Sequence, residues 1–474
     1  MGYHPIQKPG NIEEAIDELS KHKEIKRILD PVYAGVLMIS KGESAPSIVW
    51  RSDLQFLGNV LGIDEPRWAT RFHLWENLSE CQEARYVGFL NSRPEQITQK
   101  VNEGNRGIIA DAFLAPPARM MYPPYHLTVL GTYSRVYGVE PYACVPFSKP
   151  YRIFGSLCAQ ASIFVALVIC TRIGGHAIGT FEITCIANPG KSFFQVEGLT
   201  VEQISAVFRD QSVKLNSFLE IFRDADGPNQ DLKFSGINKI ILGYLEAGLP
   251  VILNVDYNLL YRTTVPKPAH CIVLIGYKRG IGLDPDCYVY NDSARGPFME
   301  KDSFLLLAAA IGKDKSVKFI VPVPLGVAHS LTKIPQVHQK FAHEVKEGAC
   351  FRYSLASDKV LRQYSVGPST EIPNEENQEN DHTIEKFLRP QLDLLQLKIP
   401  KYVWVKEFYD SVKDATMGYC SAFAIFDATS EPEKEEESFI LFFDGAYLTL
   451  RDEKTPIWLF SRRKIKAKRI PLVA

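Results

Sequence analysis

The sequence predicts an α+β fold in three regions: a mixed α/β N-terminal region (residues 1–145), a central domain (146–325) and a C-terminal region (326–474). A chain of 474 residues has room for about two to four domains. In the central domain the predicted helices precede most of the strands instead of alternating with them, which is typical of α+β folds. In the C-terminal region, the pair Asp444-Gly445 lies between apolar runs and predicts a two-residue hairpin.

The N-terminal region alternates short apolar runs, such as AGVLMIS, YVGFL, GIIADAF and HLTVLGTY, with polar and proline-rich connections. This pattern predicts mixed helices and strands. The segment LAPPARMMYPPYH (residues 114–126) contains four prolines, which exclude a regular element. We expect a loop packed on the domain surface, with contact to a substrate as the alternative.

The central domain begins with FGSLCAQASIFVAL, where we expect a helix from Cys158 to about Arg172. The apolar run SIFVALVIC inside it is about half the length needed to cross a bilayer, so this is a core helix. The orphan N–H groups of its first turn favour a thiolate at Cys158. A cysteine at such a position is also compatible with simple core packing.

Further helices are predicted from Thr200, where Gln203 completes a capping box, from about Ser212, and from near Ser235 to the stop at Gly248. A buried strand follows in LPVILNV, and then come the apolar strands CIVLIGY and CYVY, the helix FLLLAAA and the strand VKFIVPV.

The C-terminal region is predicted to hold a helix (IPQVHQKFAHEVKEG), an acidic linker (STEIPNEENQENDH, residues 369–382) and an antiparallel β-meander. The strands of the meander lie in YVWV, YCSAFAIFD and FILFFDGAYLTLR. The basic run SRRKIKAKR near the C-terminus is interpreted as a charged edge strand.

The composition of the chain limits the partners, cofactors and cellular location that we expect. Lys and Arg total 54 against 55 for Asp and Glu, so we expect neither a nucleic-acid nor a membrane partner. The nine cysteines include no Cys-x-x-Cys pair, which argues against a zinc site and indicates reduced thiols. The first residues contain no apolar h-region. We therefore expect a cytoplasmic protein without a metal or other cofactor.

Three positions could form a catalytic site. His270 begins an apolar strand in PAHCIVLIGY, and Asn291 and Asp292 end the next strand in YVYNDSARGPF. Thiol catalysis needs a base to accept the proton of Cys158, and that imidazole needs a third group to orient it. Taken singly, His270 could be a structural histidine and Asp292 a turn residue; together they supply all three roles in a suitable order.

This order of elements resembles the papain-like fold, specifically the C39-like peptidase family, and the resemblance covers the central domain only. It implies Cys158 as nucleophile, His270 as base and Asp292 as orienting acid, with Asn291 as the alternative if the register shifts by one. The family usually places a glutamine six residues before the cysteine to bind the oxyanion, and here that position is Arg152. Arg152 or Gln160 could therefore supply the donor beside the Cys158 N–H.

The expected function is that of a cysteine protease, which hydrolyses a peptide or amide bond through a thioester at Cys158. The alternatives are a papain-like acyltransferase, a catalytically inactive module that binds peptides or partner proteins, and an effector-type protease whose flanking domains recognise one target. His176 in GGHAIG is a competing base, although its glycine-rich setting favours a turn. Cys271, beside His270, lacks further ligands at metal-binding spacing.

Overall fold

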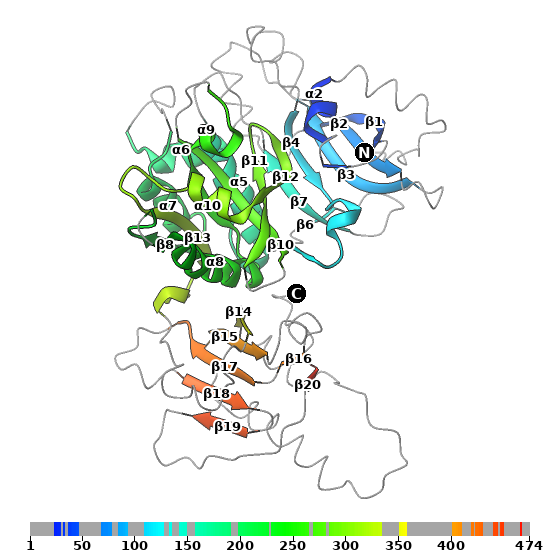
Figure 1. Ribbon diagram of the computed structural model, residues 1–474. Coiled ribbons are helices and arrows are strands. Elements are labelled where there is room, and N and C mark those ends of the chain that lie inside the picture. Colours follow the sequence, from blue (N-terminus) through cyan, green and yellow to red (C-terminus); the bar gives the residue numbers. More distant parts are fainter. Residues whose placement is uncertain are drawn as a thin grey trace, which may run out of the picture. The chain divides into compact units, whose positions relative to one another are not determined.

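The chain forms two compact units, which are described separately in the computed structural model (Figure 1). One unit contains Met1–Ile237 and Leu249–Leu325, and the other contains Asn238–Gly248 and Gly326–Ala474. The fold is mixed α/β, and the strand pairs of the described residues are antiparallel. The described residues are 23–29, 32–33, 37–46, 68–77, 84–92, 109–127, 132–134, 142–148, 157–190, 198–226, 229–264, 269–280, 284–333, 350–357, 401–409, 419–420, 422–429, 439–443, 446–449 and 465–466.

The first unit begins with helix α2 (Lys23–Leu29) and a six-stranded sheet of order β1-β2-β3-β4-β7-β6. Leu74, Val87 and Leu114, on three neighbouring strands, are fully buried and belong to the hydrophobic core. The N-terminal region is therefore built around an antiparallel sheet. Its strands are β1 (Leu37–Pro46), β2 (Trp68–Asn77), β3 (Ala84–Ser92), β4 (Ile109–Leu114), β6 (Thr132–Ser134) and β7 (Tyr142–Ser148).

The second sheet of this unit has the order β12-β11-β10-β9-β13-β8, and β5 also pairs with β10. Strand β10 is its organising element, because it pairs with β9 over its first half and with β11 over its second half. The strands are β5 (Tyr125–Leu127), β8 (Leu215–Phe222), β9 (Val251–Val255), β10 (His270–Arg279), β11 (Pro285–Asp292), β12 (Gly296–Asp302) and β13 (Val317–Pro324).

Helix α5 (Cys158–Cys170) lies against β10 of this sheet and β7 of the N-terminal sheet. Every residue of α5 after Cys158 is buried, which agrees with the core helix predicted from SIFVALVIC. A helix that is apolar on all sides needs packing on all sides, and the two sheets provide it. Only the first residue of α5 is left partly exposed.

The predicted capping box at the start of α7 is confirmed: the Thr200 hydroxyl accepts from the Gln203 N–H and the Gln203 side chain accepts from the Thr200 N–H. Among the described residues, no helix has the length and apolar character to span a membrane. The remaining helices are α6 (Thr180–Ala187), α7 (Val201–Arg209), α8 (Gln230–Glu246), α9 (Tyr257–Tyr261) and α10 (Ser303–Ala309), with 3₁₀ turns η2 (Ala118–Met120), η4 (Thr171–Ile173) and η6 (Leu331–Lys333).

The helix predicted from about Ser212 is wrong. Residues Leu215–Phe222 form β8, which pairs along its whole length with β13. Burial alternates over much of β8, as in a strand with one face on the core, and α7 packs against it. The pairing partner lies about a hundred residues downstream, so a local pattern could not reveal it.

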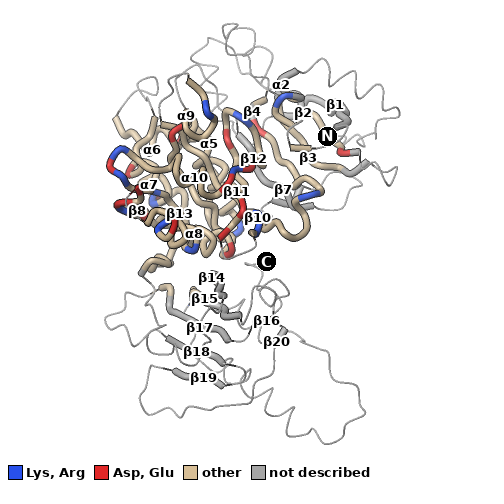
Figure 2. The backbone as a smooth tube through the Cα atoms, viewed as in Figure 1, with Lys and Arg blue, Asp and Glu red and all other residues tan. Residues whose placement is uncertain are grey.

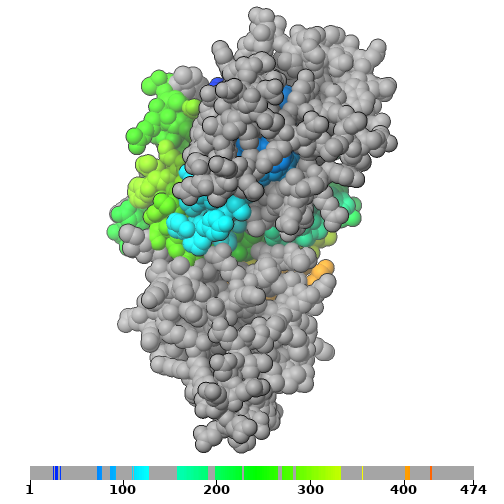
Figure 3. Space-filling model, turned by 90° about the vertical axis from the view of Figure 1, so that its right-hand side faces the viewer, coloured from blue at the N-terminus to red at the C-terminus, as the bar shows by residue number. Residues whose placement is uncertain are grey.

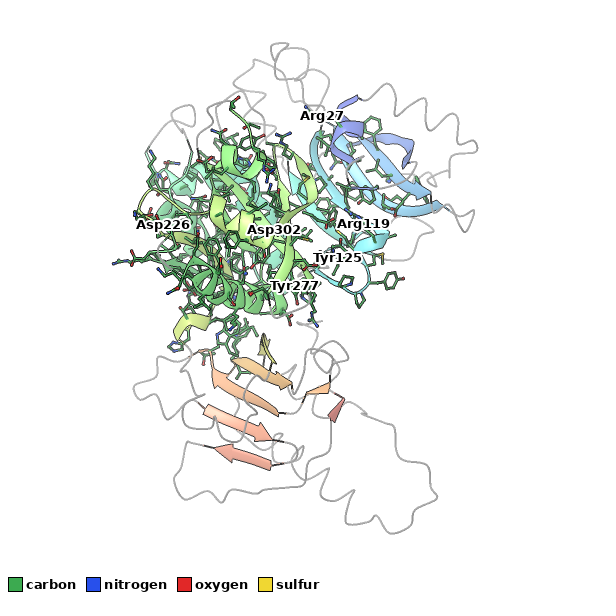
Figure 4. The ribbon with its side chains drawn as sticks, in the orientation of Figure 1. Arg27, Arg119, Tyr125, Asp226, Tyr277 and Asp302 are labelled. Carbon is green, nitrogen blue, oxygen red and sulfur yellow. The ribbon has the colours of Figure 1, made fainter. Side chains whose placement is uncertain are left out.

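Residues 114–127 pair, through β5, with the C-terminal half of β10. Strand β5 pairs with Gly276–Lys278, and Glu300 of β12 binds both Arg119 (2.8 Å) and the Tyr125 hydroxyl (3.0 Å). Figure 4 labels Arg119 and Tyr125 in this segment. Figure 3 shows this cyan segment at the surface beside green residues of the central domain. About 20 Å of extended strand separates Gly276 from His270, so the segment lies away from the catalytic pair.

The second unit contains a five-stranded antiparallel sheet whose strands follow in sequence order, as predicted for a meander. Phe443 pairs with Ala446 across the predicted hairpin. The expected helix at 334–348 and the acidic linker at 369–382 lie outside the described residues. The strands are β14 (Cys350–Ser357), β15 (Tyr402–Tyr409), β17 (Ala422–Asp427), β18 (Phe439–Phe443) and β19 (Ala446–Thr449), and β16 (Tyr419–Cys420) pairs with β20 (Ile465–Lys466).

Candidate active site

Three predicted residues come together where two strands and a helix end. Cys158 is the first residue of α5, His270 the first of β10 and Asp292 the last of β11. Because β10 and β11 are antiparallel neighbours, the start of one lies beside the end of the other. Helix α5 packs on β10, which brings its N-terminus to the same edge.

His270 and Asp292 form a buried pair. The Nε2 atom of His270 lies 2.9 Å from Oδ1 of Asp292, and the two residues are 7% and 0% exposed. The same oxygen accepts the backbone N–H groups of Ala294 (2.7 Å) and Arg295 (3.3 Å). Burial alone would raise the pKa of Asp292, but these bonds and the charge of His270 outweigh it, so the pKa is lowered. Asp292 is therefore ionised at neutral pH.

The second oxygen of Asp292 has a dedicated donor, which the sequence analysis missed. The Tyr261 hydroxyl, at the end of α9, donates to Oδ2 and lies 3.3 Å from the Tyr290 hydroxyl. Burial and the negative charge of Asp292 raise the pKa of Tyr261 well above its ordinary value. Tyr261 therefore remains a neutral donor, and both oxygens of the carboxylate are held.

Cys158 is the other partner of His270. The side chain of Cys158 is hydrogen-bonded to that of His270, whose Nε2 also binds Asp292. Burial lowers the pKa of His270, but the hydrogen bonds and charges of Asp292 and Cys158 overcome this and raise it to about 10. A protonated imidazole between two acidic partners is the arrangement that activates a thiol.

One hydrogen bond ties the helix to the strand next to the catalytic pair. Ser162, one turn after Cys158, donates from its hydroxyl to the carbonyl oxygen of Cys271 (3.2 Å), and Cys271 follows His270. Burial raises the pKa of the Cys271 thiol, and burial also raises that of Cys170 at the other end of α5. These two buried thiols are poor nucleophiles, whereas Cys158 is partly exposed.

Aromatic rings pack against His270 beside the hydrogen-bonded pair. The Tyr257 ring packs edge-to-face on His270, with centroids 5.1 Å apart, and also contacts the Tyr261 ring at 4.7 Å. The guanidinium of Arg295 lies over Tyr261 at 4.6 Å from the ring centroid. The local signal was present in the sequence: Asp256 caps the short helix YNLLY directly after a buried strand.

Of the two candidate oxyanion donors, Arg152 and Gln160, the structure describes only Gln160. Arg152 lies outside the described residues. Gln160 is completely buried and its side-chain Nε2 donates to Thr184 of α6 (3.4 Å), so it is not available beside the thiol. The reason is helical geometry, because residues two apart point to different faces. In the described part of the chain, the first-turn N–H groups of α5 are donors at this end of the helix, and its N-cap, Leu157, has an apolar side chain.

The structure also separates the two alternative site residues from the pair. Asn291 accepts a hydrogen bond from the Phe298 N–H (3.0 Å) with its side-chain oxygen, so Asp292 and not Asn291 orients His270. His176 is exposed beyond the C-terminal end of α5, where the neighbouring Gly175 N–H bonds to the Cys170 carbonyl. It is separated from Cys158 by the length of the helix.

The described part of the chain contains no cluster of three or more His, Cys, Asp or Glu side chains arranged to hold a metal ion. Comparison with models of known protein families finds no match, and comparison with curated proteins finds none either.

Proposed function

We propose that the chain is a cysteine hydrolase that cleaves peptide or amide bonds through a thioester at Cys158. The observation that carries this proposal is the position of His270, whose side chain is hydrogen-bonded both to Cys158 and to Asp292. A helix-borne cysteine packed on an antiparallel sheet, with His and Asp on neighbouring strand ends, also supports a papain-like, C39-like central domain.

The mechanism follows from these contacts. In the resting site His270 already holds the proton of Cys158 as an imidazolium–thiolate pair, and the thiolate attacks the substrate carbonyl carbon. The N–H groups at the start of α5 hold the oxyanion. The C–N bond breaks as His270 returns the proton to the leaving amine, and a thioester remains on Cys158. Water, deprotonated by His270, adds to the thioester; the C–S bond breaks and the carboxylic acid leaves.

The site needs no metal or other cofactor for these steps. Five cysteines whose side chains the structure describes are free thiols, namely Cys158, Cys170, Cys185, Cys271 and Cys287, and we propose a reducing compartment such as the cytoplasm as the location. The flanking regions are proposed to recognise a peptide or protein substrate.

Selective alkylation tests the proposal. Wild type is treated with substoichiometric iodoacetamide, and peptide mapping compares Cys158 with Cys185, which is exposed and serves as an internal reference. We expect most of the adduct on Cys158, a loss of this preference in His270→Ala, and no change in the control His176→Ala.

Scattered labelling that is indifferent to His270 would instead indicate an inactive binding module. If an active enzyme is found, the mass of the product separates hydrolysis from transfer to an amine, because only hydrolysis adds a water oxygen to the acyl product.

A further inference from the structure

Arg295 lies at the rim of the candidate active site. It is an exposed residue in the turn between β11 and β12, immediately after the residues that wrap Asp292. Its guanidinium carbon is 4.6 Å from the Tyr261 ring centroid and 5.7 Å from that of Tyr257. Since Tyr257 packs directly on His270, a single aromatic ring separates the guanidinium from the imidazole.

The guanidinium is held in place before any ligand binds. Its backbone N–H donates to Asp292, which anchors the turn, and the two tyrosine rings support its side chain. Stacking on aromatic rings leaves the edge of a guanidinium, with its fork of N–H donors, open to a carboxylate. A pre-organised cation loses less conformational entropy on binding than a mobile one.

The positive charge of Arg295 is not matched nearby. Among the described residues, no carboxylate forms an ion pair with Arg295. Asp256 caps α9 by accepting the N–H groups of Asn258 and Leu259, and the oxygens of Asp292 are committed.

Two more cations lie beside the same short helix. Arg262 follows α9 and is exposed, and the Lys301 ammonium donates to the Leu260 carbonyl (2.6 Å). Burial lowers the pKa of Lys301, and the charge of Arg262 lowers it further. Elsewhere in this unit, acidic and basic residues are interspersed (Figure 2). Arg262, Arg295 and Lys301 therefore place three cations at this rim. The carboxylates beside them already have partners: Asp256 and Asp302 cap helices, and Asp292 binds His270 and Tyr261.

We propose that Arg295 binds an acidic group of the substrate, so that the enzyme selects peptides with Asp, Glu or a free carboxylate close to the scissile bond. This inference rests on the proposed hydrolase function and specifies its substrate class.

Two alkylating agents of similar size test whether the charge of Arg295 acts at the thiol. Iodoacetate is anionic and iodoacetamide is neutral, so the ratio of their rates at Cys158 reports the local potential. We expect Arg295→Gln to lower this ratio about two- to fivefold, the range for an exposed charge pair. Arg295→Lys retains the charge and should retain most of the ratio.

The matched control is Arg223→Gln, which removes the same charge from the turn after β8, at the opposite edge of the sheet. It should leave the ratio unchanged. An equal ratio in wild type and Arg295→Gln, or an equal fall in both glutamine variants, would overturn the inference. If either result is found while iodoacetamide still labels Cys158 selectively, only the role of Arg295 is refuted and the hydrolase proposal stands. If iodoacetamide labels wild type unselectively, the hydrolase proposal is refuted, and the inference about Arg295 is refuted with it.

The substrate class is then read from cleavage of a mixed peptide library by the full-length protein. Wild type should cut sites enriched in Asp or Glu at one position near the bond, Arg295→Gln should lose this enrichment, and Arg295→Glu should favour Lys or Arg there. Cleavage by wild type without any acidic preference would exclude the proposal.

Discussion

Removal of the Tyr261 hydroxyl should lower the stability of the fold. In Tyr261→Phe, Oδ2 of the buried Asp292 carboxylate loses the donor that holds it, while the Oδ1 bonds to His270 and the backbone remain. A hydrogen bond to a charged group contributes about 1.5–3 kcal/mol, and the partial exposure of Tyr261 places the expected loss near the lower end. We expect the free energy of unfolding to fall by about 1.5 kcal/mol at pH 7.

The assay is urea unfolding of the full chain, with Tyr122→Phe as the control, because the Tyr122 ring is 69% exposed and its change should stay within about 0.5 kcal/mol. The bond stabilises the ionised form of Asp292, so the difference between wild type and Tyr261→Phe should shrink as the pH falls through the lowered pKa of Asp292. Equal stability of Tyr261→Phe and wild type at pH 7, or a difference that persists in acid, would refute this account of the carboxylate.

Three further predictions concern the pair and the attached strand. Asp292→Asn should lower the pKa of His270 from about 10 and slow the alkylation of Cys158 by iodoacetamide by at least about tenfold. Both effects are measured in a pH–rate profile of the alkylation, and a profile equal to that of wild type would contradict the role of the carboxylate. The pKa of His270 is raised above its ordinary 6.5, so its contribution to stability is complete below pH 6.5 and is lost as the pH rises through about 10. The pKa of Asp292 is lowered, so its contribution is present above its ordinary 3.8 and is lost as the pH falls through the lowered value. A plot of melting temperature against pH should therefore lose its alkaline decline in His270→Ala. Gly276→Ala would place a Cβ against the His126 carbonyl oxygen of β5. The substitution should therefore destabilise the chain by about 2 kcal/mol and make residues 114–127 sensitive to limited proteolysis. If the variant resists proteolysis as well as wild type does, the two strands do not approach so closely.

The sequence located the three central residues because each carries a local signal. Cys158 follows a break and begins an apolar helix, while His270 and Asp292 stand at the two ends of consecutive apolar strands. Antiparallel pairing of those strands then brings the two residues together, so the proximity of His270 and Asp292 follows from topology. The same reasoning left Asn291 open as an alternative, since only the side-chain contacts separate neighbouring strand residues.

Other features depend on contacts that no local pattern contains. Tyr261 reaches Asp292 from a five-residue helix, and nothing in the letters YNLLY specifies that partner. Gln160 has a suitable amide near the cysteine, yet the helical rotation and Thr184 direct it away. Leu215–Phe222 became a strand instead of a helix because β13 pairs with it, which is a tertiary preference overriding a local one.

The most direct test of the account is acid-quenched intact mass after brief exposure of the full-length protein to p-nitrophenyl acetate, followed by peptide mapping. The account predicts release of p-nitrophenol, one acetyl group on Cys158, and loss of that acetyl with time as water hydrolyses the thioester. Cys158→Ala should show neither the acetyl group nor the rapid release, and His270→Ala should acetylate slowly. Equal release and equal acetylation in wild type and Cys158→Ala would contradict the central claim that Cys158 is the nucleophile.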